Sequence, residues 1–316
     1  MRVFPMRQLN KGFFMHQSRF WVVLPLLALQ LALAASALAA PLKTAAVEIT
    51  DDTGQVLQLA KTAQRMISLS PHITENLFAI GAGNLIVGAV EYSDYPEAAK
   101  QIPLIGGYNQ LDIEGLVALE PDLIIAWHSG NPVAQLERLA GLGIPIYYTE
   151  PRSFAAVSHE LRQLGRLTGK EAQAEAAALA FEEGAEQLKA EYAQQRPVRV
   201  FYQVWEQPLM TLNGEHLISE GLSLCGGVNI FADLNQLVPV ISREVVLAQN
   251  PEVIMGGGMG EATPAWLESW KKYRSLQAVQ EKKLYFIPPS LVQRPTPRFL
   301  QGTKIICDKL QAARNF

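Results

Sequence analysis

Cysteine and histidine are scarce in this chain, and positive charge is not in excess. Only 2 cysteines and 5 histidines occur in 316 residues, and no two histidines have the H-x-x-x-H spacing of a helical zinc site. The sequence also has no histidine-rich loop, no G-x-S-x-G nucleophile elbow and no P-loop. It has 27 basic and 30 acidic residues, whereas nucleic-acid-binding proteins are usually basic. These absences argue against an enzyme of those classes, a bound metal or cofactor, and a nucleic-acid partner.

Acidic residues are missing from the start of the chain, where none precedes Glu48. Four basic residues lie among the first 39, an apolar run covers residues 20–35, and small residues follow at 37–39. This order is typical of a secretory signal peptide, which we place at residues 1–39, and it predicts a periplasmic protein. An uncleaved membrane anchor is the alternative. The remaining chain has 23 basic and 30 acidic residues, a net charge of about −7.

The two cysteines, Cys225 and Cys307, both fall in the second half of the chain. An even number of cysteines in an oxidising compartment favours a disulfide, although two separate buried thiols are the alternative. We predict that Cys225 and Cys307 are bridged. A bridge that closes so long a loop would stabilise the fold by about 4 kcal/mol.

Short apolar runs alternate with helical patterns along most of the chain. Residues 47–50 and 55–59 flank an Asp/Gly turn and predict a β-hairpin. The predicted strands that follow are 66–69, 85–89, 123–127, 144–148 and 198–204. The predicted helices between them are 71–80, 113–119, 132–142 and 153–167. This alternation predicts an α/β fold in which helices cover both faces of mostly parallel sheets.

One long helix divides the pattern. Residues 171–194 are rich in Ala, Glu, Leu and Gln, and Gly184 is their single weak helix former. A helix of this length measures about 36 Å, and Pro197 ends it.

The second half of the chain repeats features of the first. Residues 112–124 and 242–254 each have a polar N-cap, a Glu in the first turn, and a Pro followed by an acid before a strand. Residues 72–77 and 216–222 share a weaker similarity. Chance similarity of helix–strand junctions is the alternative to a true repeat. We predict an N-terminal lobe at 40–168, a linking helix at 169–196 and a C-terminal lobe at 197–316, with a ligand cleft between the lobes.

Several segments resemble a known family. Residues 49–52 (ITDD), 65–71 (RMISLSP) and 74–75 (TE) resemble the opening of the helical-backbone metal-complex receptors, the class III solute-binding proteins of ABC importers for siderophores, haem and cobalamin. Segments 92–96 (YSDYP), 126–131 (AWHSGN) and 225–231 (CGGVNIF) are more similar to the cobalamin-binding members. The resemblance covers essentially the whole chain after residue 39. It implies two Rossmann-like lobes, one rigid linking helix and only modest closure.

Four aromatic residues follow predicted strands or lie in loops, where α/β folds bind ligands. They are Tyr92, Tyr108, Trp127 and Trp205. A corrin is flat and apolar on its faces, so aromatic walls suit it; ordinary packing is the alternative for any one of these side chains. The resemblance places Tyr92 and Tyr108 where cobalamin-binding relatives have aromatic contacts.

Other candidate ligand contacts depart from those relatives. Val238 stands where they have a Trp, and residues 290–292 (SLV) replace an Asp-Trp-Phe run. Arg294 is retained, and we predict that it reaches an amide or phosphate of the ligand unless it is an ordinary surface arginine. His72 follows Pro71 at a helix start, and we interpret it as a neighbour of the cap and not as a ligand.

Glu114 and Glu244 occupy matching places in the two repeated segments. An acid in the first turn of a helix stabilises that helix by about 0.3–1 kcal/mol, which is one explanation. The resemblance implies another, because family members use one such Glu in each lobe to pair with arginines of a two-fold permease.

The resemblance and the residues together favour a monomeric transport receptor for a corrinoid such as cobalamin. Its partners would be that ligand and an inner-membrane ABC permease with its ATPase, and the corrinoid would be cargo and not a cofactor. A ferric-siderophore or haem receptor of the same family is the alternative, and an exported α/β hydrolase or chelatase is a more distant one.

Overall fold

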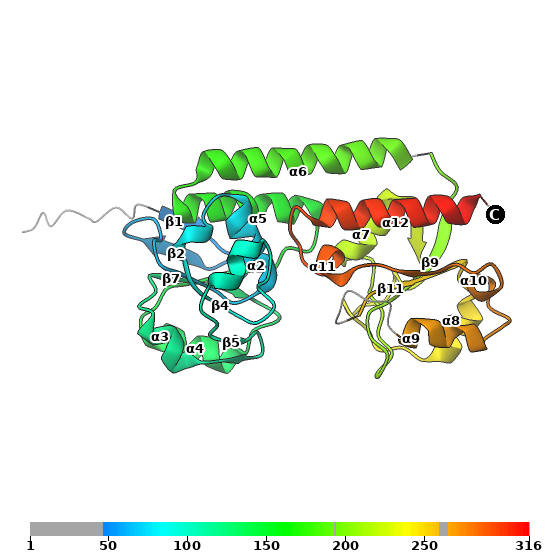
Figure 1. Cartoon of the computed structure of the whole chain (residues 1–316), viewed down its shortest axis with the longest axis horizontal. Helices are drawn as coiled ribbons and strands as arrows, with labels where there is room; N and C mark the ends of the chain where they lie inside the picture. The colour runs from blue at the N-terminus through cyan, green and yellow to red at the C-terminus, as the bar shows by residue number, and fades with distance from the viewer. Residues whose placement is uncertain (1–46, 193, 259–264, 316) are drawn as a thin grey trace, which may run out of the picture. The chain divides into compact units, whose positions relative to one another are not determined.

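The computed structural model describes residues 47–192, 194–258 and 265–315. The predicted signal peptide at 1–39 lies outside the described residues. No helix within the described ranges has the length and apolar character needed to cross a membrane. Two α/β lobes lie side by side beneath a long helix (Figure 1).

The first lobe contains a β-hairpin and a four-stranded parallel sheet. The hairpin pairs β1 (Val47–Thr50) with β2 (Val56–Leu59). The sheet has the order β4-β3-β7-β8, and its strands are β3 (Met66–Ser68), β4 (Ile86–Ala89), β7 (Leu123–Trp127) and β8 (Ile146–Thr149). The middle strands β3 and β7 are almost wholly buried, which explains their continuous apolar sequences.

Short helices and turns connect these strands. They are α2 (Pro71–Ala79), η1 (Gly83–Leu85), η2 (Glu97–Gln101), α3 (Ile113–Ala118) and α4 (Val133–Gly141), with a small β-ribbon of β5 (Gly106–Gly107) and β6 (Gln110–Leu111). Pro71 is at the first position of α2, where its missing N–H costs no helical hydrogen bond.

The second lobe repeats the parallel sheet. Its strand order is β10-β9-β11-β12, with β9 (Val198–Gln203), β10 (Gly227–Asn229), β11 (Val253–Gly256) and β12 (Leu284–Phe286). Its helices are α7 (Leu217–Leu224), α8 (Arg243–Gln249), α9 (Ala265–Glu268), η3 (Ser269–Lys272), α10 (Gln277–Gln280), α11 (Pro289–Val292) and α12 (Phe299–Arg314). The predicted α/β class with two parallel-sheet lobes is confirmed.

Two helices connect the lobes, α5 (Phe154–Thr168) and α6 (Glu171–Tyr192). They pack against each other, and Figure 1 shows α6 running above both α5 and α12. Both helices contribute to both lobes. Leu164 of α5 and Ala178 of α6 lie in the first-lobe core, whereas Phe154 of α5 and Phe181 of α6 stack in the second-lobe core.

This sharing makes the connection stiffer than the single linking helix that the sequence predicted. Gly184 has a packing role within it, because a Cβ at that position would meet Leu300 of α12 at 2.5 Å. The weak helix former therefore lets α12 approach α6.

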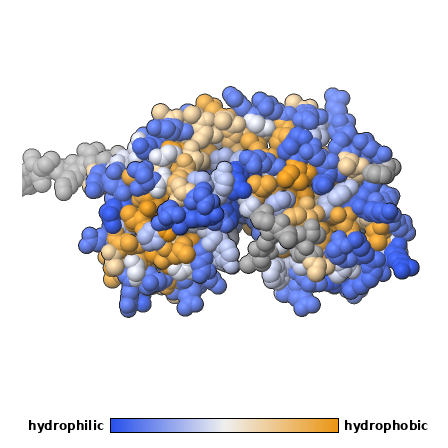
Figure 2. All heavy atoms as spheres, in the orientation of Figure 1, coloured by the Kyte–Doolittle hydropathy of each residue, from blue (hydrophilic) through white to orange (hydrophobic). Residues whose placement is uncertain are grey.

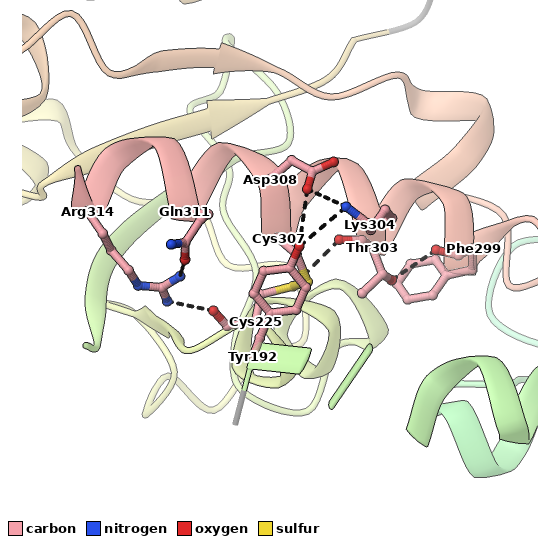
Figure 3. Close-up of a disulfide and its surroundings, with 9 residues drawn as sticks. All are labelled: Tyr192, Cys225, Phe299, Thr303, Lys304, Cys307, Asp308, Gln311 and Arg314. Carbon is pink, nitrogen blue, oxygen red and sulfur yellow. Dashed lines mark hydrogen bonds and ion pairs between the residues drawn. A yellow bond between two sulfur atoms is a disulfide. The ribbon is translucent and has the colours of Figure 1, made fainter. Parts of the chain in front are cut away.

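The predicted disulfide between Cys225 and Cys307 is present (Figure 3). It joins the end of α7 to the middle of α12 within the core of the second lobe. Arg314 reinforces the same junction, since its Nη2 donates to the Cys225 carbonyl at 2.7 Å. The two cysteines are 82 residues apart in sequence, which corresponds to about 4.5 kcal/mol of stabilisation in the chain-entropy model.

Glu160 of α5 is one of the buried acids of the first lobe. The neighbouring side chains of Thr149 and Asn76 interact with the Glu160 carboxyl and offset only part of the cost of its burial. Burial, with a smaller contribution from the charge of Asp52, raises the pKa of Glu160 to about 8. The folded protein therefore holds a proton at neutral pH that the unfolded chain releases.

This difference predicts a loss of stability as pH rises. Between about pH 4.5 and pH 8 the folded state binds one more proton at Glu160 than the unfolded state does, so unfolding becomes easier with increasing pH. Glu160→Gln should remove this dependence and raise the free energy of unfolding at pH 8 by ~4 kcal/mol, with little change at pH 4.5. Urea unfolding across this range measures the effect. The exposed Glu183→Gln is the control, and equal pH dependence in both variants would contradict the prediction.

Candidate functional site

A cavity of about 450 Å³ lies between the two lobes and is lined by both. Figure 2 shows the surface notched between the lobes on the side away from α6. The first lobe lines the cavity with residues that follow β3, β4, β7 and β8. The second lobe contributes residues near the end of β9, the start of α7, and the segments after β11 and β12. Parallel strands bring their carboxyl ends to one edge of each sheet, so the connecting loops meet there.

Three aromatic side chains form the first-lobe wall of the cavity: Tyr92, Tyr108 and Trp127. Tyr92 is 59% exposed and Tyr108 is 39% exposed, so both present large apolar surfaces to the opening. The rings of Tyr108 and Trp127 are tilted against each other, with their centroids 6.3 Å apart. We call these three residues the aromatic wall.

Asn131 holds two members of the aromatic wall through one buried amide. Its Oδ1 accepts from the Trp127 backbone N–H at 2.7 Å, and its Nδ2 donates to the Tyr108 carbonyl at 3.0 Å and to the Leu69 carbonyl at 2.9 Å. Gly130 packs directly against Trp127, because a Cβ at position 130 would overlap the Trp127 ring. The geometry of the wall therefore depends on residues that do not face the ligand.

Asn131→Ala should weaken ligand binding about tenfold by releasing Tyr108 and Trp127, and should also lower stability, because buried groups lose their partners. Asn229→Ala in the second lobe is a matched control. Asn229 also makes three buried hydrogen bonds, to Leu212, Ser219 and Phe231, none of which lines the cavity. Ligand titrations beside thermal unfolding distinguish the two: similar losses of affinity would show that general destabilisation, and not the wall, is responsible.

The fourth predicted aromatic, Trp205, is not among the residues that line the cavity. Its indole N–H donates to the Gln207 carbonyl at 3.1 Å, and the backbone at Trp205 pairs with Met210. Strand β9 ends at Gln203, and Val204 lines the cavity in its place. Successive side chains of an extended segment point to opposite sides, so when Val204 faces the cavity its neighbour Trp205 points away from it.

Arg294 lines the cavity, but its guanidinium is already engaged by the first lobe. Its Nη1 donates to Glu75 at 2.7 Å and to Asp94 at 2.9 Å, and its Nη2 donates to the Tyr92 carbonyl at 3.0 Å. These bonds fix the backbone of Tyr92, which has a positive φ of 65°. The interaction with Tyr92 links Arg294 to the aromatic wall through the backbone.

The rest of segment 294–298 also binds the first lobe. Thr296 Oγ1 and Arg298 Nη1 both donate to Glu75, which is buried, and Asn76 Nδ2 donates to the Pro295 carbonyl. The Arg298 guanidinium stacks over the Tyr95 ring at 3.8 Å. We call this set of contacts the inter-lobe clasp. It joins the lobes a second time, separately from α5 and α6.

Two histidines line the cavity that the sequence did not place there, His72 and His216. His72 lies at the start of α2, the helix that follows β3, and His216 lies at the start of α7, the helix that follows β9. His72 is 4% exposed, bonds Ser70 Oγ through Nδ1 at 2.7 Å, and meets the Trp127 ring edge to face. Burial lowers the pKa of His72 to about 3 and that of His216 to about 4. The similarity between residues 72–77 and 216–222 was the signal that could have paired them.

The paired acids Glu114 and Glu244 lie in the first turns of α3 and α8, and both are exposed. Asp112 and Ser242 cap these helices by accepting from Gly115 N and Val245 N. A hydrogen bond from its own backbone N–H and one from Ser242 lower the pKa of Glu244. In Figure 1 both helices lie on the side of their lobe that faces away from α6.

Two α/β lobes, a stiff helical connection and a ligand-sized cavity at facing strand ends define a solute-binding protein. The family model described as periplasmic binding protein matches residues 66–291. The chain belongs to this family.

Relatives in this family are similar over most of the chain. A vitamin B12-binding protein from Vibrio cholerae is 36% identical over 252 residues, which are 80% of this chain and 91% of the relative. A vitamin B12-binding protein from Yersinia pestis is 37% identical over 251 residues, 79% of this chain and 88% of the relative.

Solved structures agree with this fold. The periplasmic vitamin B12-binding protein BtuF of Vibrio cholerae superposes with a TM-score of 0.73 at 35% identity and covers 80% of this chain and 99% of its own. The haem-binding protein RhuT from Roseiflexus has a TM-score of 0.72 at 23% identity, with 80% of this chain and 99% of its own covered, and supports the fold alone.

Proposed function

We propose that this protein captures cobalamin or a closely related corrinoid in the periplasm and delivers it to the permease of an ABC importer. The observation that carries the proposal is the aromatic wall of Tyr92, Tyr108 and Trp127 in a cavity between two stiffly connected lobes. A corrin presents wide apolar faces that such rings cover, while its fringe of amides needs neutral hydrogen-bonding groups. The vitamin B12-binding relatives support the same ligand.

The charge of the cavity also supports a neutral, amide-rich ligand. Its lining includes two arginines, Arg152 and Arg294, and the carboxylate Glu150. Glu75 and Asp94 neutralise Arg294, and both cavity histidines are uncharged at neutral pH because burial lowers their pKa values. A receptor for haem or an anionic ferric siderophore would need more positive charge to bind the negative charge of these ligands.

The exposed acids Glu114 and Glu244 provide the means of delivery in this proposal. They carry one negative charge on each lobe, so a permease with approximate two-fold symmetry can offer one arginine to each. The protein would act as a monomer, without a catalytic residue or cofactor, and the corrinoid would be its cargo.

Co-purification tests the ligand directly. The purified protein is incubated separately with cobalamin, cobinamide, haem and a ferric siderophore, and each mixture is passed over a desalting column. We expect red pigment to elute with the protein for the corrinoids only. Elution of haem or siderophore with the protein, and of no corrinoid, would overturn the proposal in favour of another receptor of the family.

A further inference from the structure

Among the residues that the structure describes, Arg152 differs from the other cavity arginine, Arg294, in having hydrogen-bond donors without partners. It lies in the segment between β8 and α5 and lines the cavity. Its Nε donates to Glu150 Oε1 at 3.3 Å, and Glu150 is held in turn by Ser129 N at 2.9 Å and Ser129 Oγ at 3.0 Å. Within the described part of the chain, neither terminal nitrogen of Arg152 has a partner, whereas both terminal nitrogens of Arg294 are bonded.

His216 supplies a second donor from the other lobe. Its Nδ1 accepts from the Ile218 backbone N–H at 3.1 Å as the N-cap of α7. A ring that accepts at Nδ1 carries its proton at Nε2 when neutral, so Nε2 is a donor. Burial keeps the ring neutral, and the nearby positive charge of Arg152 lowers the pKa of His216 further.

Arg152 and His216 are brought together by the junction of α5 and α7. The Phe154 backbone N–H at the start of α5 donates to Glu220 Oε2 of α7 at 2.8 Å. Phe154 follows Arg152 by two residues, and Glu220 follows His216 by one helical turn. The two side chains therefore reach the same cavity from adjoining helix starts, one in each lobe.

We propose that Arg152 and His216 form a subsite for the phosphodiester of a nucleotide-bearing corrinoid. This inference rests on the proposed function and assigns to Arg152 the phosphate contact that the sequence suggested for Arg294. A guanidinium with two free terminal nitrogens matches the paired oxygens of a phosphate, and an imidazole N–H adds a third donor. The amides of the corrin ring are neutral and do not need a positive charge. Arg152 and His216 would therefore contribute to binding of the nucleotide loop and not of the ring.

Two ligands that differ in the nucleotide loop test the subsite. Cobalamin contains the phosphodiester, and cobinamide has the same ring without the loop. In calorimetric titrations Arg152→Ala should weaken cobalamin binding about tenfold or more and change cobinamide binding by less than about twofold. His216→Ser should act in the same direction, since serine still caps α7 but is too short to reach the ligand.

Arg196→Ala is the matched control, because Arg196 is an exposed arginine paired with Glu252 at 2.8 Å and does not line the cavity. It should leave both affinities unchanged. An equal loss for both ligands in Arg152→Ala, or no loss for either, would overturn the subsite. Failure of the unaltered protein to bind either corrinoid would instead overturn the proposed function.

Discussion

Replacing Glu114 and Glu244 together by lysine should abolish corrinoid uptake by cells while the purified protein still binds corrinoid normally. Both side chains are exposed in the first turn of a short helix, and neither lines the cavity. If each pairs with a permease arginine, reversal places like charges face to face at two points of one interface. Uptake of labelled cobalamin, compared with titration in solution, measures the two effects separately.

Glu171→Lys is the control for this experiment. Glu171 is also exposed in the first turn of a helix, α6, but α6 lies on the opposite side of the molecule from α3 and α8 (Figure 1). Uptake should be normal in the Glu171→Lys variant. Replacing Glu114 and Glu244 by alanine should reduce uptake less than replacing both by lysine. Normal uptake by Glu114→Lys, Glu244→Lys at ordinary expression would leave the acids only their stabilising interaction with the helix dipole.

The double change Tyr92→Ala, Tyr108→Ala should weaken corrinoid binding by about 100-fold, equivalent to ~2–3 kcal/mol. Tyr92 is 59% exposed and Tyr108 is 39% exposed in the cavity lining, so their removal takes away ligand contacts without leaving a hole in the core. Thermal unfolding should change little for the same reason.

Trp205→Ala serves as the comparison, since Trp205 is as exposed as Tyr108 and does not line the cavity. The Trp205→Ala variant should bind cobalamin with the same affinity as the unaltered protein. Full affinity in the tyrosine variant would place the ligand away from the aromatic wall, and a loss in Trp205→Ala would restore the role that the sequence assigned to it.

The sequence predicted the fold well because local patterns determine it. Buried strands such as β7 read as apolar runs, α6 is composed of strong helix formers, and caps such as Ser153 mark where helices begin. The bridging role of α5 was not predictable in this way. Phe154 and Leu164 are both ordinary apolar helix positions, and only the three-dimensional packing assigns them to different lobes.

The candidate site was predictable only in part, for a related reason. Strand ends identified Tyr92 and Trp127, because position along a parallel strand determines which edge of the sheet a loop occupies, and the loop after Gly107 identified Tyr108. The partners of Arg294 were hidden, since Glu75 is 219 residues away in sequence. For the same reason, the sequence could not show that, among the described residues, the terminal nitrogens of Arg294 have partners and those of Arg152 have none.

The inter-lobe clasp has a consequence for how cargo leaves. Segment 294–298 and the α5–α6 pair attach the lobes at separate places. The lobes are therefore constrained at two points and cannot rotate freely about a single hinge. Thermal motion can separate the lobes at the cavity only by breaking the hydrogen bonds to Glu75 and Asn76 together. If the protein delivers its ligand as proposed, contacts with the permease would have to supply the free energy that separates the lobes as well as the free energy that releases the ligand.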